Sequence, residues 1–177
     1  ENFKFIEAPK GLFQIEADTN FKVCKKVSPR SLEELSAVVA IARPGALDYL
    51  DTYAEYRSTG EFQSVNEYFD DILSHTGGIP LYQEQLMKMA VKVGFTLDEA
   101  EQLRRIVGKK KIDQMPAWKA KIEQKIQDNN LGEEVGDVLW KVAEDSANYS
   151  FNKSHSISYA MLASITCLLY TSDAADD

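Results

Sequence analysis

The clearest helical pattern in the chain is LGEEVGDVLWKVAEDSA, at residues 131–147. Its apolar residues recur every three or four positions, so one face of a helix would carry them all. These residues are Leu131, Val135, Val138, Leu139 and Val142. The stretch therefore predicts an amphipathic helix that buries one face.

Signals for the start of further helices occur three times upstream of this stretch. SLEE at 31–34, SVNE at 64–67 and TLDE at 96–99 are capping boxes. In a capping box, a hydroxyl and a glutamate satisfy free amides of the first helical turn. Together with apolar spacing and stops at Gly or Pro, these signals predict helices over residues 31–43, 46–57, 64–75, 83–93, 96–108 and 113–129.

The residues expected to face inward are apolar and recur at helical spacing. They are Leu32, Leu35, Val39 and Ala42; Leu47, Leu50 and Ala54; Leu86, Met89, Ala90 and Val93; and Met115, Trp118, Ile122 and Ile126.

Strand signals are few. A Pro-Lys-Gly turn precedes apolar residues at 11–15, and residues 79–82 follow a Gly-Gly turn. We expect a short strand at each place. The fold class predicted from the sequence is therefore mainly α, with one or two short strands.

Composition limits the class of protein. The chain has 177 residues, 44% of them hydrophobic and 27% charged, as in a globular protein with a real core. Its formal net charge of −8 argues against a general nucleic-acid coat protein. Cys24 and Cys167 lie far apart and outside any metal-ligand spacing, which favours reduced thiols in the cytoplasm. We expect no secretory signal and no membrane span.

A basic cluster occurs in LRRIVGKKK at residues 103–111. Arginine presents a planar fork of donors that matches phosphate oxygens, and lysine adds a compact charge. Cations near the C-terminus of a helix also compensate the helix dipole, at about 0.3–1 kcal/mol each. From spacing alone, the cluster is either an anion site or ordinary helix chemistry.

A second polar cluster is SFNKSHSISY at residues 150–159. If the segment is helical, Asn152, His155 and Tyr159 lie on one face. The imidazole could act as a general base, a phosphate donor or a metal ligand, although a lone histidine in a capped segment is most often structural. No Gly-x-Ser-x-Gly, P-loop or Gly-x-Gly-x-x-Gly motif appears in the sequence.

Five motifs, in this order, resemble one family. They are GLFQIE at 11–16, ARPGAL at 42–47, GIPLYQEQLM at 78–87, LRRIVGKKK at 103–111 and ANYSFNKSHS at 147–156. The family is the C-family replicative DNA polymerases of bacteria and their phages, represented by the DNA polymerase III alpha subunit. The resemblance covers about residues 11–170. One departure is Ala46, where the family usually has a second proline.

The resemblance implies that this region follows the catalytic palm and forms the fingers, a helical domain that closes over the incoming nucleotide. Residues 1–30 would then be the end of the palm and the junction with its short strands, and 31–170 the fingers. Residues 171–177 are patternless and acidic, and we expect them to be a non-native tail.

The resemblance also places particular residues at the nucleotide. Two motifs contribute them: Arg104, Arg105 and Lys109 at the triphosphate, and Asn152, Lys153 and His155 in the nucleotide pocket. The weaker candidates, for which a structural role stays open, are Arg43, Gln83, Gln85 and Tyr159.

Polymerisation in the family is a phosphoryl transfer assisted by two metal ions, expected to be Mg²⁺ held by palm carboxylates. Asp18, Asp70 and Asp71 do not form such a carboxylate motif. The implied partners are a deoxynucleoside triphosphate, primer-template DNA and other replisome subunits, in the cytoplasm and without a membrane. We expect the 177 residues alone not to extend a primer, and measurable extension by the purified chain would refute this.

Two other readings remain open from the residues. The chain could be a non-catalytic helical interaction module whose basic cluster only caps helices. It could also be a free nucleotide- or nucleic-acid-binding protein, which the net charge disfavours and a strong salt dependence of binding would revive. The polymerase reading requires Arg104 or Arg105 to face the same cleft as residues 152–155.

Overall fold

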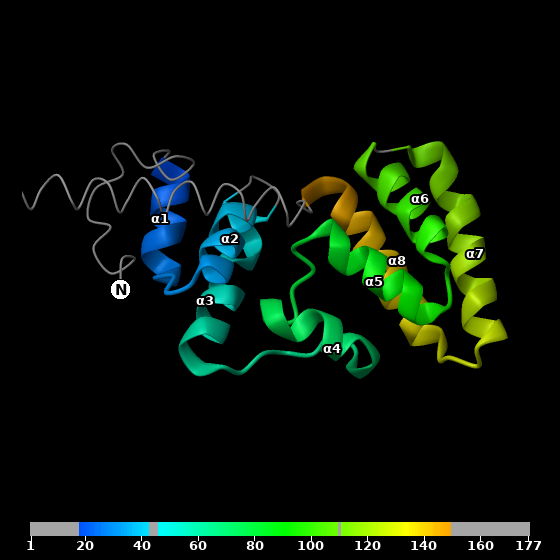
Figure 1. The fold of residues 1–177 in the computed structure, drawn as a ribbon, viewed down its shortest axis with the longest axis horizontal. Coiled ribbons are helices and arrows are strands. Elements are labelled where there is room, and N and C mark those ends of the chain that lie inside the picture. Colours follow the sequence, from blue (N-terminus) through cyan, green and yellow to red (C-terminus); the bar gives the residue numbers. More distant parts are fainter. Residues whose placement is uncertain (1–17, 43–45, 110, 150–177) are drawn as a thin grey trace, which may run out of the picture. The chain divides into compact units, whose positions relative to one another are not determined.

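A computed structural model describes residues 18–42, 46–109 and 111–149 (Figure 1). Within these ranges the chain forms helices joined by turns, and no β-strand. This confirms the expectation of a mainly α fold. The chain divides after Gly60 into two compact units, residues 1–60 with 151–177 and residues 61–150. The domain boundaries expected at residues 30 and 170 stay a prediction.

The first unit contains α1 (Asp18–Val27), α2 (Leu32–Ile41), the short 3₁₀ helix η1 (Leu47–Tyr49) and α3 (Leu50–Thr59). Helix α1 packs against both α2 and α3. It was not predicted from the sequence, because no capping signal precedes it. Its buried residues are closely spaced: Val23, Cys24 and Val27.

Helix α2 begins where its capping box predicted. The Ser31 hydroxyl accepts a hydrogen bond from the Glu34 amide at 3.2 Å. The Glu34 carboxylate accepts from the amide of Arg30, one residue before the cap, at 2.5 Å. The same carboxylate pairs with Arg57 of α3 at 3.0 Å. The capping glutamate therefore also ties α2 to α3.

Two expectations for the segment before residue 80 need correction. Residues 46–57 form η1 and then α3. Their buried residues are Ala46 and Tyr53, while Leu47, Leu50 and Ala54 are only partly buried.

The second capping box is displaced by two residues. Asn66, not Ser64, provides the cap, because its side-chain oxygen accepts from the Tyr68 amide at 2.9 Å. Ser64 instead donates to Asp70 at 2.6 Å. The continuous helix expected over 64–75 is a succession of short helices: η2 (Glu67–Phe69), α4 (Asp70–Leu73) and η3 (Ser74–Thr76).

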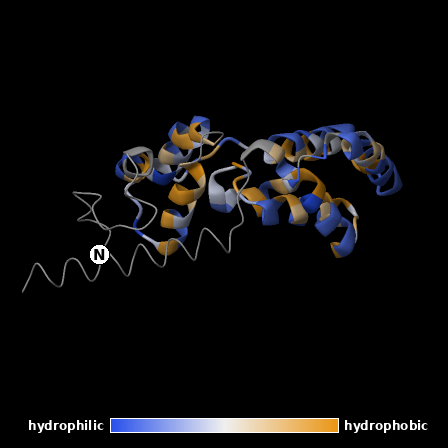
Figure 2. Ribbon diagram, turned by 90° about the horizontal axis from the view of Figure 1, so that it is seen from above, coloured by the Kyte–Doolittle hydropathy of each residue, from blue (hydrophilic) through white to orange (hydrophobic). Residues whose placement is uncertain are grey.

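The second unit is completed by α5 (Gln83–Val93), α6 (Leu97–Gly108), η4 (Ile112–Gln114), α7 (Met115–Asp128) and α8 (Glu133–Tyr149). Helix α8 contacts α5, α6 and α7, and α5 packs along α6. Figure 2 shows hydrophobic residues alternating with hydrophilic ones along these helices. Their buried residues form one core: Leu86, Met89, Ala90, Val93, Phe95, Ala100, Leu103, Val107, Trp118, Ile122, Ile126, Val135, Leu139, Val142 and Ala143, with Phe69 and Leu73 from the preceding segment.

The apolar face predicted for residues 131–147 is confirmed, with one change at its start. Val135, Leu139 and Val142 are buried in α8. Leu131 instead closes α7, because its amide donates to the carbonyl of Ile126 at 2.9 Å. Asn130, with φ of 52°, provides the left-handed residue that this helix ending requires.

Helix α8 approaches α7 closely at Gly136. A β-carbon built at Gly136 would lie 3.0 Å from Cγ1 of Ile126 and 3.8 Å from Cγ2 of Ile122. Both isoleucines are buried. A side chain at residue 136 would therefore require Ile126 to shift by a few tenths of an ångström.

The strand expected at 79–82 does not form. The amides of Leu81 and Tyr82 both donate to the side-chain oxygen of Gln85, at 2.9 and 3.0 Å. The Ile79 amide donates to the Thr76 carbonyl at 3.3 Å. Because these amides donate to acceptors within the same segment, they are not available to pair with a strand. The segment instead serves as the N-terminal cap of α5. The other expected strand, at 11–15, lies outside the described residues.

Candidate functional site

Helix α6 carries the basic cluster and begins at the third predicted capping box, which is confirmed. The Glu99 amide donates to the Thr96 hydroxyl at 3.2 Å, and the Thr96 amide donates to the Glu99 carboxylate at 3.1 Å. These hydrogen bonds hold the pKa of Glu99 below its usual value. The helix ends at Gly108, so Arg104 and Arg105 lie near its C-terminus, with Lys109 just beyond it.

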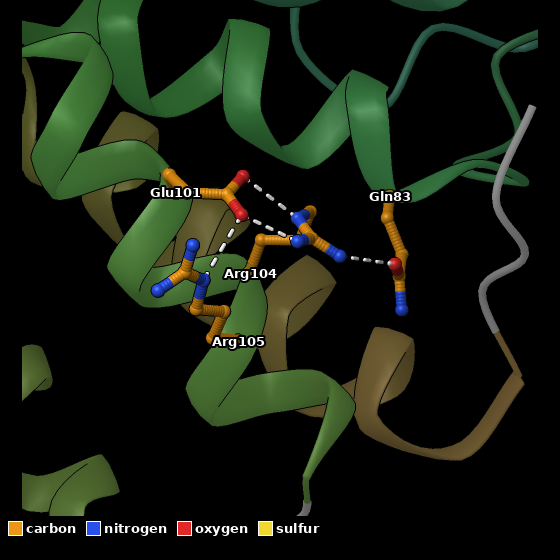
Figure 3. A network of polar contacts seen from close by, with 4 residues as sticks. All are labelled: Gln83, Glu101, Arg104 and Arg105. Carbon is orange, nitrogen blue, oxygen red and sulfur yellow. Dashed lines mark hydrogen bonds and ion pairs between the residues drawn. The ribbon is translucent and has the colours of Figure 1, made fainter.

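Arg104 is held by side chains at both ends of its guanidinium group (Figure 3). Its Nε donates to Glu101 Oε2 at 2.8 Å, and its Nη2 donates to Glu101 Oε1. Its Nη1 donates to Oε1 of Gln83, at the start of α5, at 3.3 Å. The Arg104 and Glu101 side chains are 28% and 31% exposed, so the pair lies at the surface but is partly shielded from water.

Arg105 shares the same carboxylate but is held more loosely. Its Nε donates to Glu101 Oε1 at 3.1 Å, and its side chain is 63% exposed. Lys109 is exposed. The structure thus brings Arg104, Arg105 and Gln83 together around Glu101.

The charges of this network are coupled. The hydrogen bonds from Arg104, and to a lesser extent that from Arg105, lower the pKa of Glu101 to about 2, although desolvation acts in the opposite direction. The bond to Glu101, and the nearby charges of Glu101 and Glu84, raise the pKa of Arg104. Because the folded pKa of Glu101 is depressed, the stabilisation it provides is complete above its usual value of 4.5 and is lost as the pH falls toward 2.

Sequence reasoning missed Glu101 as a member of this site. It precedes Arg104 by three residues and Arg105 by four, the two spacings at which helix neighbours meet. An acidic residue N-terminal to a basic one at this spacing is a readable signal, and it would have identified Glu101.

Gln85 has a different surrounding from Gln83. It is 7% exposed. Besides accepting from the Leu81 and Tyr82 amides, its side chain donates to the Thr76 hydroxyl at 2.8 Å. Both ends of the Gln85 amide are thus engaged inside the protein, which makes it a structural residue of the loop before α5.

Several candidate residues cannot be placed. Arg43, Asn152, Lys153, His155 and Tyr159 lie outside the described residues. The expectation that Arg104 or Arg105 faces the same cleft as residues 152–155 therefore stays a prediction.

A groove of about 440 Å³ lies between α7 and α8 and contains none of the candidate residues. Its apolar lining includes Ile122 and Trp140, and its carboxylates are those of Glu123, Glu133 and Asp137. Three carboxylates against the single ammonium of Lys119 would repel a triphosphate. The groove is therefore no alternative nucleotide site.

Within the described ranges, no group of three or more His, Cys, Asp or Glu side chains is arranged to hold a metal ion. None of the helices described in the structure has the length and apolar character needed to cross a membrane.

The chain is similar to alpha subunits of bacterial DNA polymerase III. A family model described as "Bacterial DNA polymerase III alpha subunit finger domain" matches residues 3–130. The chain is 37% identical over 161 residues to the DNA polymerase III subunit alpha of Thermus aquaticus, a match that covers 87% of this chain and 13% of that protein. It is 37% identical over 167 residues to the corresponding subunit of Aquifex aeolicus, covering 91% of this chain and 14% of that protein.

A similar match is found to the alpha subunit of Treponema pallidum, 34% identical over 160 residues and covering 89% of this chain. The chain spans only 13–14% of the length of these relatives. The similarity therefore covers nearly the whole chain but a small part of each relative.

Proposed function

Because the chain belongs to the finger-domain family of bacterial DNA polymerase III alpha subunits, we propose that it forms the fingers of a replicative DNA polymerase. In this role it binds the triphosphate of the incoming deoxynucleotide and closes over the nascent base pair. Arg104 and Arg105 contact the triphosphate, and Lys109 adds positive charge nearby.

The observation that carries this proposal is the pair of guanidinium groups gathered around one carboxylate at the end of α6. The two guanidinium groups are balanced by the carboxylates of Glu101 and the nearby Glu84, and Lys109 adds one positive charge. Arginine forks are suited to phosphate oxygens, and hydrogen bonds between ionised groups are about twice as strong as neutral ones.

Compensation of the helix dipole explains the cluster less well. A cation that only stabilises the end of α6 would be directed at the last carbonyls of the helix. The hydrogen bonds of the Arg104 side chain go instead to Glu101 and, across to α5, to Gln83. Arg104 is oriented by side chains, as a ligand-binding residue would be.

The remaining functions belong to the full-length protein. We propose that it is a cytoplasmic DNA-directed DNA polymerase that acts on primer-template DNA with other replisome subunits. The described residues do not fit a metal site, so carboxylates elsewhere in the full-length protein would hold Mg²⁺. The 177 residues alone would then not polymerise DNA.

The experiment that tests this function is arginine footprinting of the full-length enzyme bound to a chain-terminated primer-template. Phenylglyoxal modifies accessible guanidinium groups, and Arg105 is accessible, with a side chain 63% exposed. We expect the next correct deoxynucleotide to lower the modification of Arg105 severalfold, because the triphosphate covers it. Modification is measured by mass spectrometry of the peptide that contains residues 103–108.

Arg30 is the internal control, because it is exposed and is not one of the candidate residues. Its modification should not respond to the nucleotide. A mismatched nucleotide at the same concentration should protect Arg105 less than the correct one. Equal modification of Arg105 with and without the correct nucleotide would contradict the proposed function.

A further inference from the structure

Among the residues that the structure describes, Glu101 is the one whose side chain is hydrogen-bonded to both arginines of the candidate site. Its Oε2 accepts from Arg104 Nε, and its Oε1 accepts from Arg104 Nη2 and Arg105 Nε. The side chain thus uses both oxygens, and it belongs to the same helix as its two partners. Neither arginine can leave this arrangement without breaking a bond to Glu101.

The contact to Arg104 occupies one edge of the guanidinium group and leaves other N–H donors available. A guanidinium group has five N–H donors: one on Nε and two on each Nη. Glu101 takes the Nε donor and one Nη2 donor, and Gln83 takes one Nη1 donor. One donor therefore remains on each Nη nitrogen for a further acceptor.

We propose that Glu101 is a positioning residue, which fixes Arg104, and more loosely Arg105, so that their remaining donors meet the triphosphate. This inference rests on the proposed function. Glu101 holds one edge of Arg104 and Gln83 holds one Nη nitrogen, so the group has little freedom to rotate. Groups held in place before the ligand arrives bind it with a smaller loss of conformational freedom.

The opposite role would be that of a competitor, a carboxylate that occupies the phosphate site until the nucleotide displaces it. The geometry favours positioning, because Glu101 and Gln83 together leave one donor on each Nη nitrogen of Arg104. A phosphate oxygen can accept from these donors while Glu101 stays in place. The depressed pKa of Glu101 keeps the carboxylate ionised at neutral pH, so the orienting contact persists there.

For the full-length enzyme, the two roles predict changes of opposite sign in the KM when Glu101 is replaced by alanine. If Glu101 positions the arginines, Glu101→Ala raises the KM for deoxynucleotides about tenfold, which is below the roughly hundredfold effect of a 1 Å misplacement. Glu101→Gln raises the KM less, because its amide oxygen still accepts a hydrogen bond. The measurement is steady-state primer extension with KM and kcat determined separately.

Asp98→Asn is the matched control, since Asp98 is an exposed carboxylate in the first turn of the same helix. It should leave the KM unchanged. In an Arg104→Ala, Arg105→Ala background, Glu101→Ala should have no further effect on the KM, because it acts only through these two residues. If Glu101 had a merely structural role, Glu101→Ala would instead lower the thermal unfolding midpoint. It would then also raise the KM by the same factor in the Arg104→Ala, Arg105→Ala background.

A lower or unchanged KM in Glu101→Ala would overturn the positioning role. If Arg104→Ala raises the KM while Glu101→Ala does not, only this inference fails. If Arg104→Ala and Arg105→Ala both leave the KM unchanged, the proposed function itself fails.

Discussion

Replacing Arg104 by alanine in the full-length polymerase is expected to raise the KM for every incoming deoxynucleotide about 10- to 100-fold. A hydrogen bond to a charged group contributes about 1.5–3 kcal/mol, and each 1.4 kcal/mol corresponds to about a factor of ten. The effect should be similar for all four nucleotides, because Arg104 would contact the triphosphate and not the base. Steady-state primer extension on four templates measures it.

Two variants make this result specific. Arg104→Lys should restore little of the loss, because an ammonium group cannot reproduce the planar fork held between Glu101 and Gln83. Arg105→Ala should have a smaller effect than Arg104→Ala, since Arg105 is more exposed and makes a single hydrogen bond to Glu101. Unchanged kinetics in both alanine variants would refute the assignment of the basic cluster to the triphosphate.

The second large effect concerns stability. Gln85→Ala is expected to lower the free energy of unfolding of the second unit by about 2–4 kcal/mol. It removes the acceptor for the Leu81 and Tyr82 amides and the donor to the Thr76 hydroxyl, all of which are buried. Each buried polar group left without a partner costs about 1–3 kcal/mol.

Urea unfolding of the 177-residue chain, followed by tryptophan fluorescence, measures this loss. The only two tryptophans of the chain, Trp118 and Trp140, both lie in the second unit and report on it selectively. Gln83→Ala is the matched control, because Gln83 makes one long hydrogen bond, to Arg104. It should change stability by less than about 0.5 kcal/mol. Equal losses in the two variants would contradict the structural role of Gln85.

The helices of this chain could be predicted where local chemistry sets their ends. The capping boxes at Ser31 and Thr96 placed α2 and α6, and Gly94 ended α5 as expected. Such signals are readable because donor and acceptor lie three residues apart in the chain. Helix α1 lacks such a signal, and its helix depends on packing against α2 and α3, which local sequence does not reveal.

The positively charged residues of the candidate site could be found in the sequence, but the residues that contact them could not. The cations of Arg104 and Arg105 were readable in the sequence, and their binding of phosphate stays a prediction. The contact of Arg104 with Gln83 joins residues 21 positions apart in the sequence, a proximity that depends on how α5 packs on α6. The separate role of Gln85 was equally hidden, since it depends on the turn at Thr76. Spacing alone does not separate a buried glutamine from a surface one.

The most direct measurement is the structure of the full-length enzyme in complex with primer-template DNA and the correct incoming nucleotide. The central claim predicts a hydrogen bond between Arg104 and an oxygen of the triphosphate, at a nitrogen–oxygen distance of about 2.7–2.9 Å. Glu101 should remain bound to the other edge of the same guanidinium group. A triphosphate bound without any contact to Arg104 or Arg105 would contradict the account.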